Sequence, residues 1–195
     1  TMAKENLENL SDEALMALYQ QGEMQAFEFL YTRYEKKIYN FLLRRIGDVE
    51  SAQELFQNVF LTLHRNRHQF DTKLNFSTWF FTMANNLLKN EFKRLYRMRK
   101  NLEHVLINFT AIDSNNGHAE LEELIIKQEN TQLIKKALSA LPESQREILL
   151  LSKFEGFTYP EIAEIMGCSV ASVKQKAYRA YLTLREKLEK HLGVI

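Results

Sequence analysis

Apolar residues recur every three or four positions over long stretches of this chain, and few glycines or prolines interrupt them. From Phe27 to Ile46 this spacing places one apolar stripe on a single face, because an α-helix turns once every 3.6 residues. Similar stripes run from Ala52 to Leu63 and from Trp79 to Leu88. The 195 residues include only 6 Gly and 2 Pro, too few for the many tight turns of a sandwich or barrel. The sequence predicts an all-α fold.

The helical pattern divides into two blocks separated by a stretch that lacks it. The first block covers residues 8–100 and contains a polar loop at Phe70–Phe76. The pattern is lost over residues 101–120, which predicts a flexible linker, and it resumes over residues 121–192. We therefore expect two small helical domains, a bundle followed by a C-terminal unit.

Charge is spread unevenly along the chain, although the formal net charge is only +1. Residues 89–100 hold six Lys and Arg against one Glu, and residues 172–190 hold six against two Glu. Residues 101–130, between these blocks, hold six acids against one Lys. One basic block is usually a solvated helix face, but two blocks on two helical units favour a polyanion bound at two places.

Several classes of site have no support in the sequence. Cys168 is the single cysteine, so neither an internal disulfide nor a cysteine-based zinc site can form. His64 and His68 have metal-ligand spacing but lack the intervening Glu of a zinc protease, which favours solvent-facing histidines. No apolar run approaches the ~20 residues that span a bilayer. We expect a cytoplasmic protein without membrane insertion, catalytic residues, cofactor or metal.

The segment from Thr158 to Ala180 has the layout of a helix-turn-helix. A short helix starting near Thr158 is followed by a turn at Gly167 and a longer basic helix starting near Ser169. In this motif the second helix enters the major groove of DNA. The alternative interpretation of this segment is an ordinary helical hairpin whose outer face is basic. Side chains that can bond bases or phosphates follow on the second helix: Ser172, Lys174, Gln175, Lys176 and Arg179.

The same segment resembles a known family. LPESQREILLL at 141–151 and EGFTYPEIAEIMG at 155–167 are similar to region 4 of bacterial sigma factors, and the match continues to Ala180. The first block resembles region 2 of these proteins, through Ala26-Phe27, Gly47-Asp48, Ala52–Leu55, Val59-Phe60 and Lys89-Asn90. The resemblance covers about Leu10 to Leu188. Because the chain lacks the extra domains of housekeeping sigma factors, it resembles the extracytoplasmic-function (ECF) subfamily.

This resemblance implies a dissociable subunit of bacterial RNA polymerase that directs promoter-specific transcription initiation. Region 2 would dock on a coiled coil of the largest subunit of the core polymerase, through positions matching Gln53, Glu54, Leu55, Gln57, Asn58 and Val59. It would also recognise and open the minus-10 promoter element, with Trp79, Asn85, Asn86, Lys89, Asn90, Lys93 and Arg94. Region 4 would read the minus-35 element with Arg146, Ser172, Lys174, Gln175, Lys176, Tyr178 and Arg179. Many family members are restrained by an anti-sigma factor, which is therefore a further expected partner.

Some positions depart from the family or allow a second interpretation. The family often has an acid where this chain has Asn58, and commonly has Arg where Lys174 and Lys176 stand. Since Lys lacks the planar fork of Arg, the promoter sequence cannot be carried over. Leu55 and Val59 could equally be core residues, and a Trp beside an apolar stripe, as at Trp79, is more often core than a stacking platform. The alternative function is a one-component helix-turn-helix regulator, which leaves the region-2 resemblance unexplained.

Overall fold

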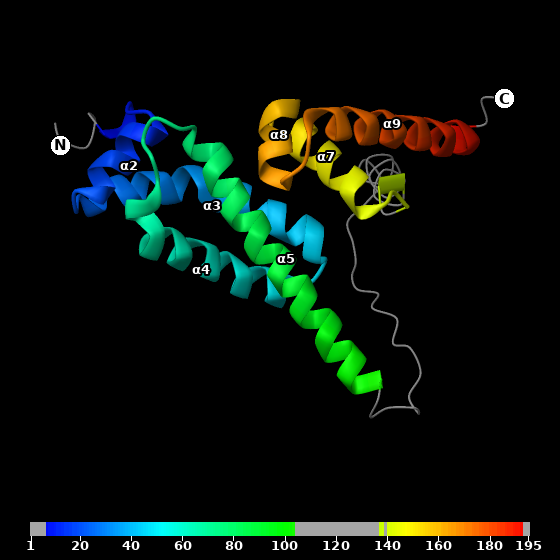
Figure 1. Cartoon of the computed structure of the whole chain (residues 1–195), viewed down its shortest axis with the longest axis horizontal. Helices are drawn as coiled ribbons and strands as arrows, with labels where there is room; N and C mark the ends of the chain where they lie inside the picture. The colour runs from blue at the N-terminus through cyan, green and yellow to red at the C-terminus, as the bar shows by residue number, and fades with distance from the viewer. Residues whose placement is uncertain (1–6, 104–136, 139, 193–195) are drawn as a thin grey trace, which may run out of the picture.

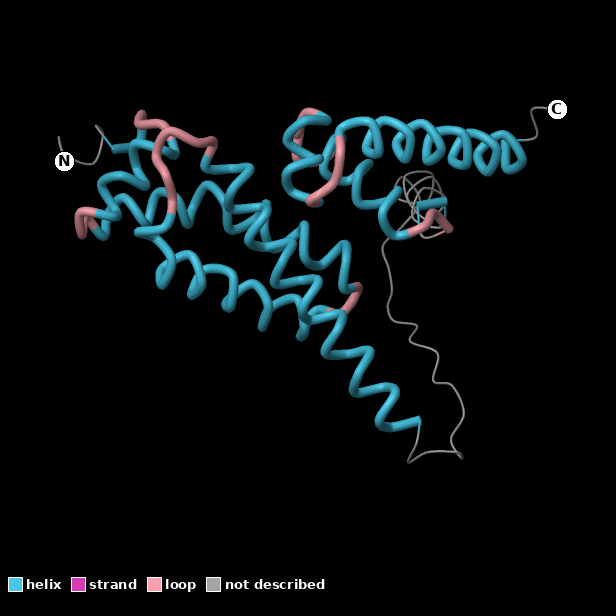
Figure 2. Tube along the Cα trace, in the orientation of Figure 1, coloured by secondary structure: helices cyan, strands magenta, loops and turns pink. Residues whose placement is uncertain are grey.

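The computed structural model describes residues 7–103, 137–138 and 140–192, with the side chains of α5 and α9 described as far as Arg97 and Lys187 (Figure 1). All regular structure in this part of the chain is helical (Figure 2), which confirms the predicted all-α class. The predicted linker at 101–120 lies outside the described residues from 104 onward. The helices are α2 Asp12–Gln20, α3 Met24–Ile46, α4 Val49–Asn66, η1 Arg67–Gln69, α5 Phe76–Glu103, α7 Glu143–Lys153, α8 Tyr159–Met166 and α9 Val170–Leu192.

Local side-chain chemistry sets the ends of the first helices. At the start of α2, the Ser11 hydroxyl accepts a hydrogen bond from the Ala14 N–H at 3.2 Å. Helix α3 ends at Gly47, whose φ of 77° lies in the left-handed region that glycine adopts without steric cost. One residue later the Asp48 carboxylate accepts from the Ser51 N–H at 2.8 Å and begins α4.

Helices α2 to α5 pack around a core rich in aromatic side chains. Tyr34 of α3 meets Phe76 and Phe80 of α5 edge-on, at ring distances of 5.3 and 5.5 Å. The Tyr34 hydroxyl donates to the Asp12 carboxylate at 2.5 Å, which joins α3 to α2. Burial, reinforced by this bond to Asp12, raises the pKa of Tyr34. The three helices are thereby fixed in one bundle.

Helices α7, α8 and α9 form the second unit, and α8 lies beside α5 of the bundle (Figure 1). Ile148, Ile162, Ile165 and Val173 are buried in this unit. They belong to the same apolar cluster as the core of the bundle. The two units therefore pack directly on one another through a continuous core.

Candidate nucleic-acid and polymerase interface

The predicted helix-turn-helix is present as α8, a short turn and α9. The Glu161 carboxylate accepts from the Thr158 backbone N–H at 2.8 Å and from its hydroxyl at 2.6 Å, which closes the start of α8. Gly167 ends α8 with a φ of 68°. The Ser169 hydroxyl then accepts from the Ser172 N–H at 3.2 Å at the start of α9. The order of helix and turn predicted from the sequence is confirmed.

The face of α9 that follows this turn is exposed and basic. Lys174, Gln175, Tyr178 and Arg179 are exposed, with Tyr178 at 65%. Ser172 and Lys176 are half-buried on the same helix, and Arg146 is half-buried on α7. Two cations, an amide and a phenol thus point to solvent where a second helix of this motif would meet DNA.

The basic part of α5 divides into exposed and covered positions. Asn86, Asn90 and Lys93 are exposed. Arg94 forms an ion pair with Glu91 at 2.6 Å, and hydrogen bonding to Arg94 lowers the pKa of Glu91. These four predicted minus-10 positions are therefore accessible on α5.

Asn85 and Lys89 of the same predicted set face the second unit instead of solvent. Asn85 is fully buried, and its side-chain amide donates to the Ile165 carbonyl at 3.0 Å. The Lys89 ammonium donates to the Met166 carbonyl at 3.2 Å. Both acceptors lie in the last turn of α8.

The loop before α5 is held in one shape by four hydrogen bonds. The Asp71 side-chain carboxylate accepts from the Lys73 N–H at 3.0 Å, and the Asp71 backbone carbonyl accepts from the Leu74 N–H at 2.9 Å. The Asn75 side chain accepts from the Thr78 N–H at 2.8 Å. The Phe76 N–H donates to Glu13 of α2 at 3.0 Å.

Trp79 lies half-buried beneath this loop. Its ring is 5.0 Å from Phe70 and 6.1 Å from Phe76, in tilted arrangements. Trp79 thus forms an aromatic cluster with Phe70 and Phe76 next to the loop, in which Phe70 and Phe76 are buried.

One face of α4 presents the polar residues predicted to contact polymerase. Gln53, Glu54, Gln57 and Asn58 are all exposed, and they lie on one side of α4 because residues three and four apart are neighbours on a helix surface. Leu55 and Val59 were included in the same prediction, but they are 6% and 0% exposed and pack in the core. Of the six predicted residues, only the four polar ones are therefore accessible to a partner.

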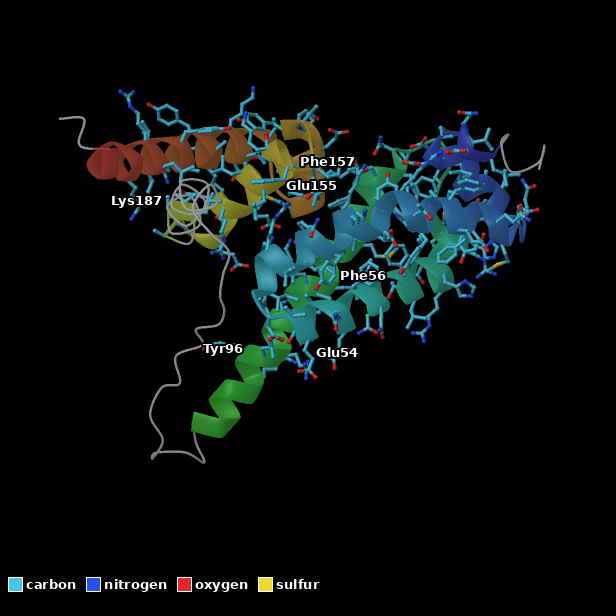
Figure 3. The ribbon with its side chains drawn as sticks, turned by 180° about the vertical axis from the view of Figure 1, so that it is seen from behind. Glu54, Phe56, Tyr96, Glu155, Phe157 and Lys187 are labelled. Carbon is cyan, nitrogen blue, oxygen red and sulfur yellow. The ribbon has the colours of Figure 1, made fainter. Side chains whose placement is uncertain are left out.

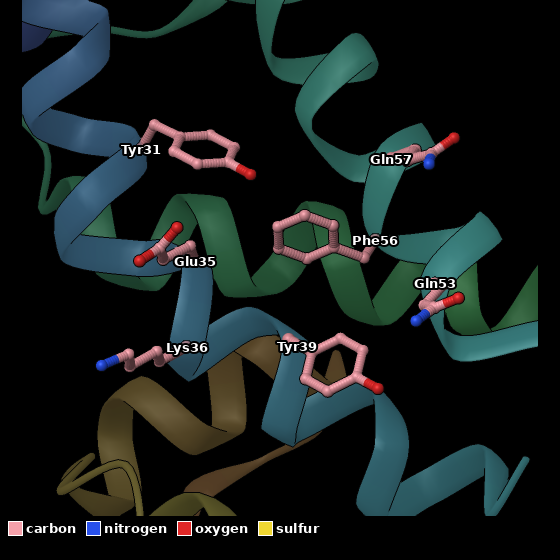
Figure 4. Close-up of a pocket in the computed structure, with 7 residues that line it drawn as sticks. All are labelled: Tyr31, Glu35, Lys36, Tyr39, Gln53, Phe56 and Gln57. Carbon is pink, nitrogen blue, oxygen red and sulfur yellow. The ribbon is translucent and has the colours of Figure 1, made fainter. Parts of the chain in front are cut away.

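A shallow groove of about 600 Å³ lies between α3 and α4, next to this polar face (Figure 4). Phe56 forms its floor and meets Tyr31 and Tyr39 edge-on, each at a ring distance of 6.1 Å. Gln53 and Gln57 line the α4 side of the groove. The polar face and the groove are therefore one continuous surface.

Two protein-family models match this chain, in the order expected from the sequence. The model described as "Sigma-70 region 2" matches residues 30–98, and "Sigma-70, region 4" matches residues 131–184. The chain belongs to the sigma-70 family. It directs promoter-specific transcription initiation with RNA polymerase, as expected from the resemblance and in preference to a one-component regulator.

Full-length relatives place it in the ECF subfamily. The chain is 28% identical over 187 residues to the ECF RNA polymerase sigma-E factor of Escherichia coli, covering 93% of this chain and 96% of that protein. It is 27% identical over 184 residues to the RNA polymerase sigma-H factor of Pseudomonas aeruginosa, covering 93% of each.

Two solved structures are also similar. The sigma factor RpoE from Bartonella quintana, in complex with the anti-sigma factor NepR, is 25% identical with a TM-score of 0.65 and covers 84% of this chain and 96% of that one. The fold is shared by CnrH, solved with the cytosolic domain of CnrY, at 21% identity and a TM-score of 0.66, covering 92% of this chain and 97% of that one.

In the ECF factor described here, charged groups join region 2 to region 4. The Arg45 guanidinium of α3, 2% exposed, pairs with Glu147 at 2.7 Å and Glu143 at 2.9 Å on α7. Arg44 pairs with Glu155 at 3.2 Å, and burial raises the pKa of Glu155. We call this set of ion pairs the interdomain clamp.

Apolar contacts complete the junction between the two regions. Phe81 of α5 meets Phe157 edge-on at a ring distance of 4.9 Å, and Arg44 lies over the Phe154 ring at 4.3 Å. Figure 3 shows Glu155 and Phe157 on the side of region 4 that faces region 2. Region 2 and region 4 thus form a closed packing.

Several residues of these surfaces were not predicted from the sequence. Leu61 is 50% exposed and continues the polar face of α4 by one turn, and its spacing from Gln57 could have indicated it. Leu74, 54% exposed at the loop before α5, could have been noted as an apolar residue among polar ones. Arg45 and Glu147 carried no comparable signal, because their pairing joins segments far apart in the chain.

The remaining candidate sites have simpler structural roles. His64 shares a 2.5 Å hydrogen bond between its Nδ1 and the Tyr19 hydroxyl. Among the described residues no cluster of three or more His, Cys, Asp or Glu could hold a metal ion. Within the same residues, no helix has the length and apolar character to cross a bilayer.

Proposed function

We propose that three surfaces divide the work of promoter recognition. The exposed face of α9 reads the minus-35 element as duplex, α5 and the preceding loop bind the opened minus-10 element, and the polar face of α4 docks on the core polymerase. The observation that carries this assignment is the exposed cluster of Lys174, Gln175, Tyr178 and Arg179 on α9, directly after the helix-turn-helix turn. The protein would act in the cytoplasm, as a subunit and not as an enzyme by itself.

Contacts to the minus-35 element follow from the chemistry of α9. Gln175 can bond adenine through both amide atoms, whereas Lys174 and Arg179 can bond guanine or phosphate. Lys176, Ser172 and Arg146 are half-buried and suit contacts to the phosphate backbone, which fix the position of the protein on DNA.

Contacts to the minus-10 element need an opened strand. Asn86, Asn90 and Lys93 are exposed on α5 and can bond base edges and phosphates of a single strand. Trp79 would support the loop from beneath, through its contacts with Phe70 and Phe76. Asn85, Lys89 and Arg94 complete the predicted set, although their donors have internal acceptors in this structure.

The polymerase-docking surface would include the groove between α3 and α4 as well as the polar face of α4. Glu54 is exposed beside Gln53 and Gln57, both of which line the groove. A helix of the polymerase lying on α4 would place side chains over Phe56 and between the two tyrosines. Aromatic walls with adaptable amides at the rim are typical of such interfaces.

An anti-sigma factor is a further proposed partner. Two structural neighbours, RpoE and CnrH, were solved with the protein NepR and with the cytosolic domain of CnrY. The first of these partners is named as an anti-sigma factor. A restraining protein of this kind would cover one or more of the three surfaces.

Mixing the chain with bacterial core polymerase tests the assignment. We expect co-elution on size exclusion and transcription from a narrow set of a randomised promoter library. Glu54→Lys should reduce co-elution, because it reverses a charge on the docking face, while duplex binding by α9 stays unchanged. Glu186→Lys, an exposed position on α9, is the matched control for docking. Tight duplex binding without any polymerase complex would favour the one-component regulator.

A further inference from the structure

Two neighbouring donors of α5 bind the end of α8. Asn85 and Lys89 are four residues apart and therefore share one face of α5. Their nitrogens donate to successive carbonyls, Ile165 at 3.0 Å and Met166 at 3.2 Å. Asn86 and Asn90, on another face, and Lys93, one turn beyond Lys89, remain exposed.

The last turn of α8 offers acceptors similar to those of a nucleic acid. The final carbonyls of a helix have no partner within it, and they lie at the negative end of the helix dipole. Amide and ammonium groups that bind such carbonyls are also the groups that bind base edges and phosphate oxygens. The carbonyls at the end of α8 and the acceptor atoms of a nucleic acid therefore both suit the Asn85 amide and the Lys89 ammonium.

The fit to α8 is incomplete at Asn85. Its Oδ1 atom is buried and has no hydrogen-bond partner in the described part of the chain. A base can satisfy an Asn side chain at both its amide and its carbonyl, whereas α8 satisfies only the amide. The covered state thus retains an unpaired acceptor that a nucleic acid could engage.

The interdomain clamp keeps α8 in this position. Arg45 reaches Glu143 and Glu147 of α7, which is packed against α8 in the same unit. The clamp residues belong to none of the three proposed recognition surfaces. They can be altered without removing a group that is expected to touch DNA or polymerase.

The closed packing covers part of one proposed DNA-binding surface, on α5, and leaves the other, on α9, accessible. Lys174, Gln175 and Arg179 of α9 are exposed in the same structure in which Asn85 is buried and Lys89 is half-buried against α8. A duplex could therefore reach α9 while the domains stay closed, whereas a single strand must displace α8 to reach Asn85.

We propose that the C-terminal turn of α8 is an internal competitor of single-stranded minus-10 DNA for the Asn85 and Lys89 side chains of α5. Binding of the strand and opening of the two regions are then one coupled event. The proposal rests on the assignment of α5 to the minus-10 strand, and it adds an order of events: duplex first on α9, single strand only after region 4 leaves region 2.

Energy transfer between dyes on the two regions measures this opening in the intact 195-residue chain. Cysteines introduced by Glu28→Cys on α3 and Glu186→Cys on α9, in a Cys168→Ser background, would carry the dyes at exposed positions. The probes are a pool of short single strands of randomised sequence and random-sequence duplex fragments. We expect the single strands to lower the transfer efficiency and the duplexes to bind without changing it.

The double variant Glu143→Gln/Glu147→Gln removes both acidic partners of Arg45 with little change in shape. We expect it to lower transfer efficiency without DNA and to raise single-strand affinity about tenfold, within the usual range of coupling between sites. Duplex affinity should stay the same, which also shows that region 4 remains folded. Glu164→Gln, at an exposed position of α8, is the matched control and should change neither quantity.

Two results would overturn the proposal. One is that single strands bind the wild-type chain without lowering transfer efficiency. The other is that the double variant opens while its single-strand affinity stays within about twofold of wild type. Failure to bind core polymerase would instead refute the proposed function, because the competition between α8 and the single strand is measured in the absence of polymerase.

Discussion

Lys174→Ala gives a quantitative test of DNA binding by α9. Lys174 is exposed on the helix, so its loss should change the free energy of unfolding by less than about 0.5 kcal/mol. Its expected role is a contact with a phosphate or a guanine. If it binds a phosphate, the main effect will be on the salt dependence of duplex affinity, because each neutralised phosphate releases counterions.

The size of this effect follows from the cations on the recognition face. Lys174 and Arg179 are exposed and Lys176 is half-buried. Together with Arg146 of α7, these cations would make four phosphate contacts, which predict a slope of log affinity against log salt of about −3.6, since each contributes about −0.9. Without Lys174 the slope should be about −2.7. Between 50 and 200 mM salt, the wild type would lose about 150-fold in affinity and the variant about 40-fold.

Fluorescence anisotropy with a labelled duplex over a salt series measures both slopes. Lys187→Ala is the matched control, because Lys187 is exposed on the same helix but about 20 Å further along it. Figure 3 shows Lys187 on the distal part of α9. An unchanged slope for Lys174→Ala, or an equal change for Lys187→Ala, would contradict the placement of DNA on the start of α9.

Three further variants test the stability of the fold by urea unfolding. Phe76→Ala removes a fully buried ring and should lower the free energy of unfolding by about 3–5 kcal/mol; a smaller loss would contradict its central place in the core. Ser169→Ala removes the hydroxyl that accepts from the Ser172 N–H and should cost about 1 kcal/mol, and no loss would mean that this cap is dispensable. Asp48→Asn tests a pH dependence, because hydrogen bonds from Ser51 lower the pKa of Asp48. Its ionised form stabilises the fold above the ordinary pKa range, and this contribution is lost as pH falls through the lowered pKa. The difference between wild type and Asp48→Asn should therefore shrink as pH falls, and a constant difference would argue against the cap.

Much of the helical fold could be predicted because its signals are local. The stripe from Phe27 to Ile46 became α3, and Gly47 ended it in the left-handed conformation. Gly167 and Ser169 separated α8 from α9 as expected. Each of these signals acts within a few residues, where side-chain spacing and backbone conformation decide the outcome.

The candidate site was predictable only in part. Polar residues on α4 and α9 could be named from their matches to the family, and most of them are exposed. Leu55 and Val59 matched the same motif yet are buried, because a motif records residue type and not the direction in which a helix faces its neighbours. The groove around Phe56 needed the relative position of α3 and α4, which neither helix specifies alone.

The sequence by itself determined the helices, their ends, the family and the identity of the groups available to meet DNA. Tertiary structure decided which of those groups are accessible in the closed packing. Asn85 and Lys89 face α8, whereas Asn86 and Asn90 are exposed, and Arg45 meets Glu143 at a separation of 98 residues. Such pairings depend on how whole helices cross and pack, so local spacing holds no information about them.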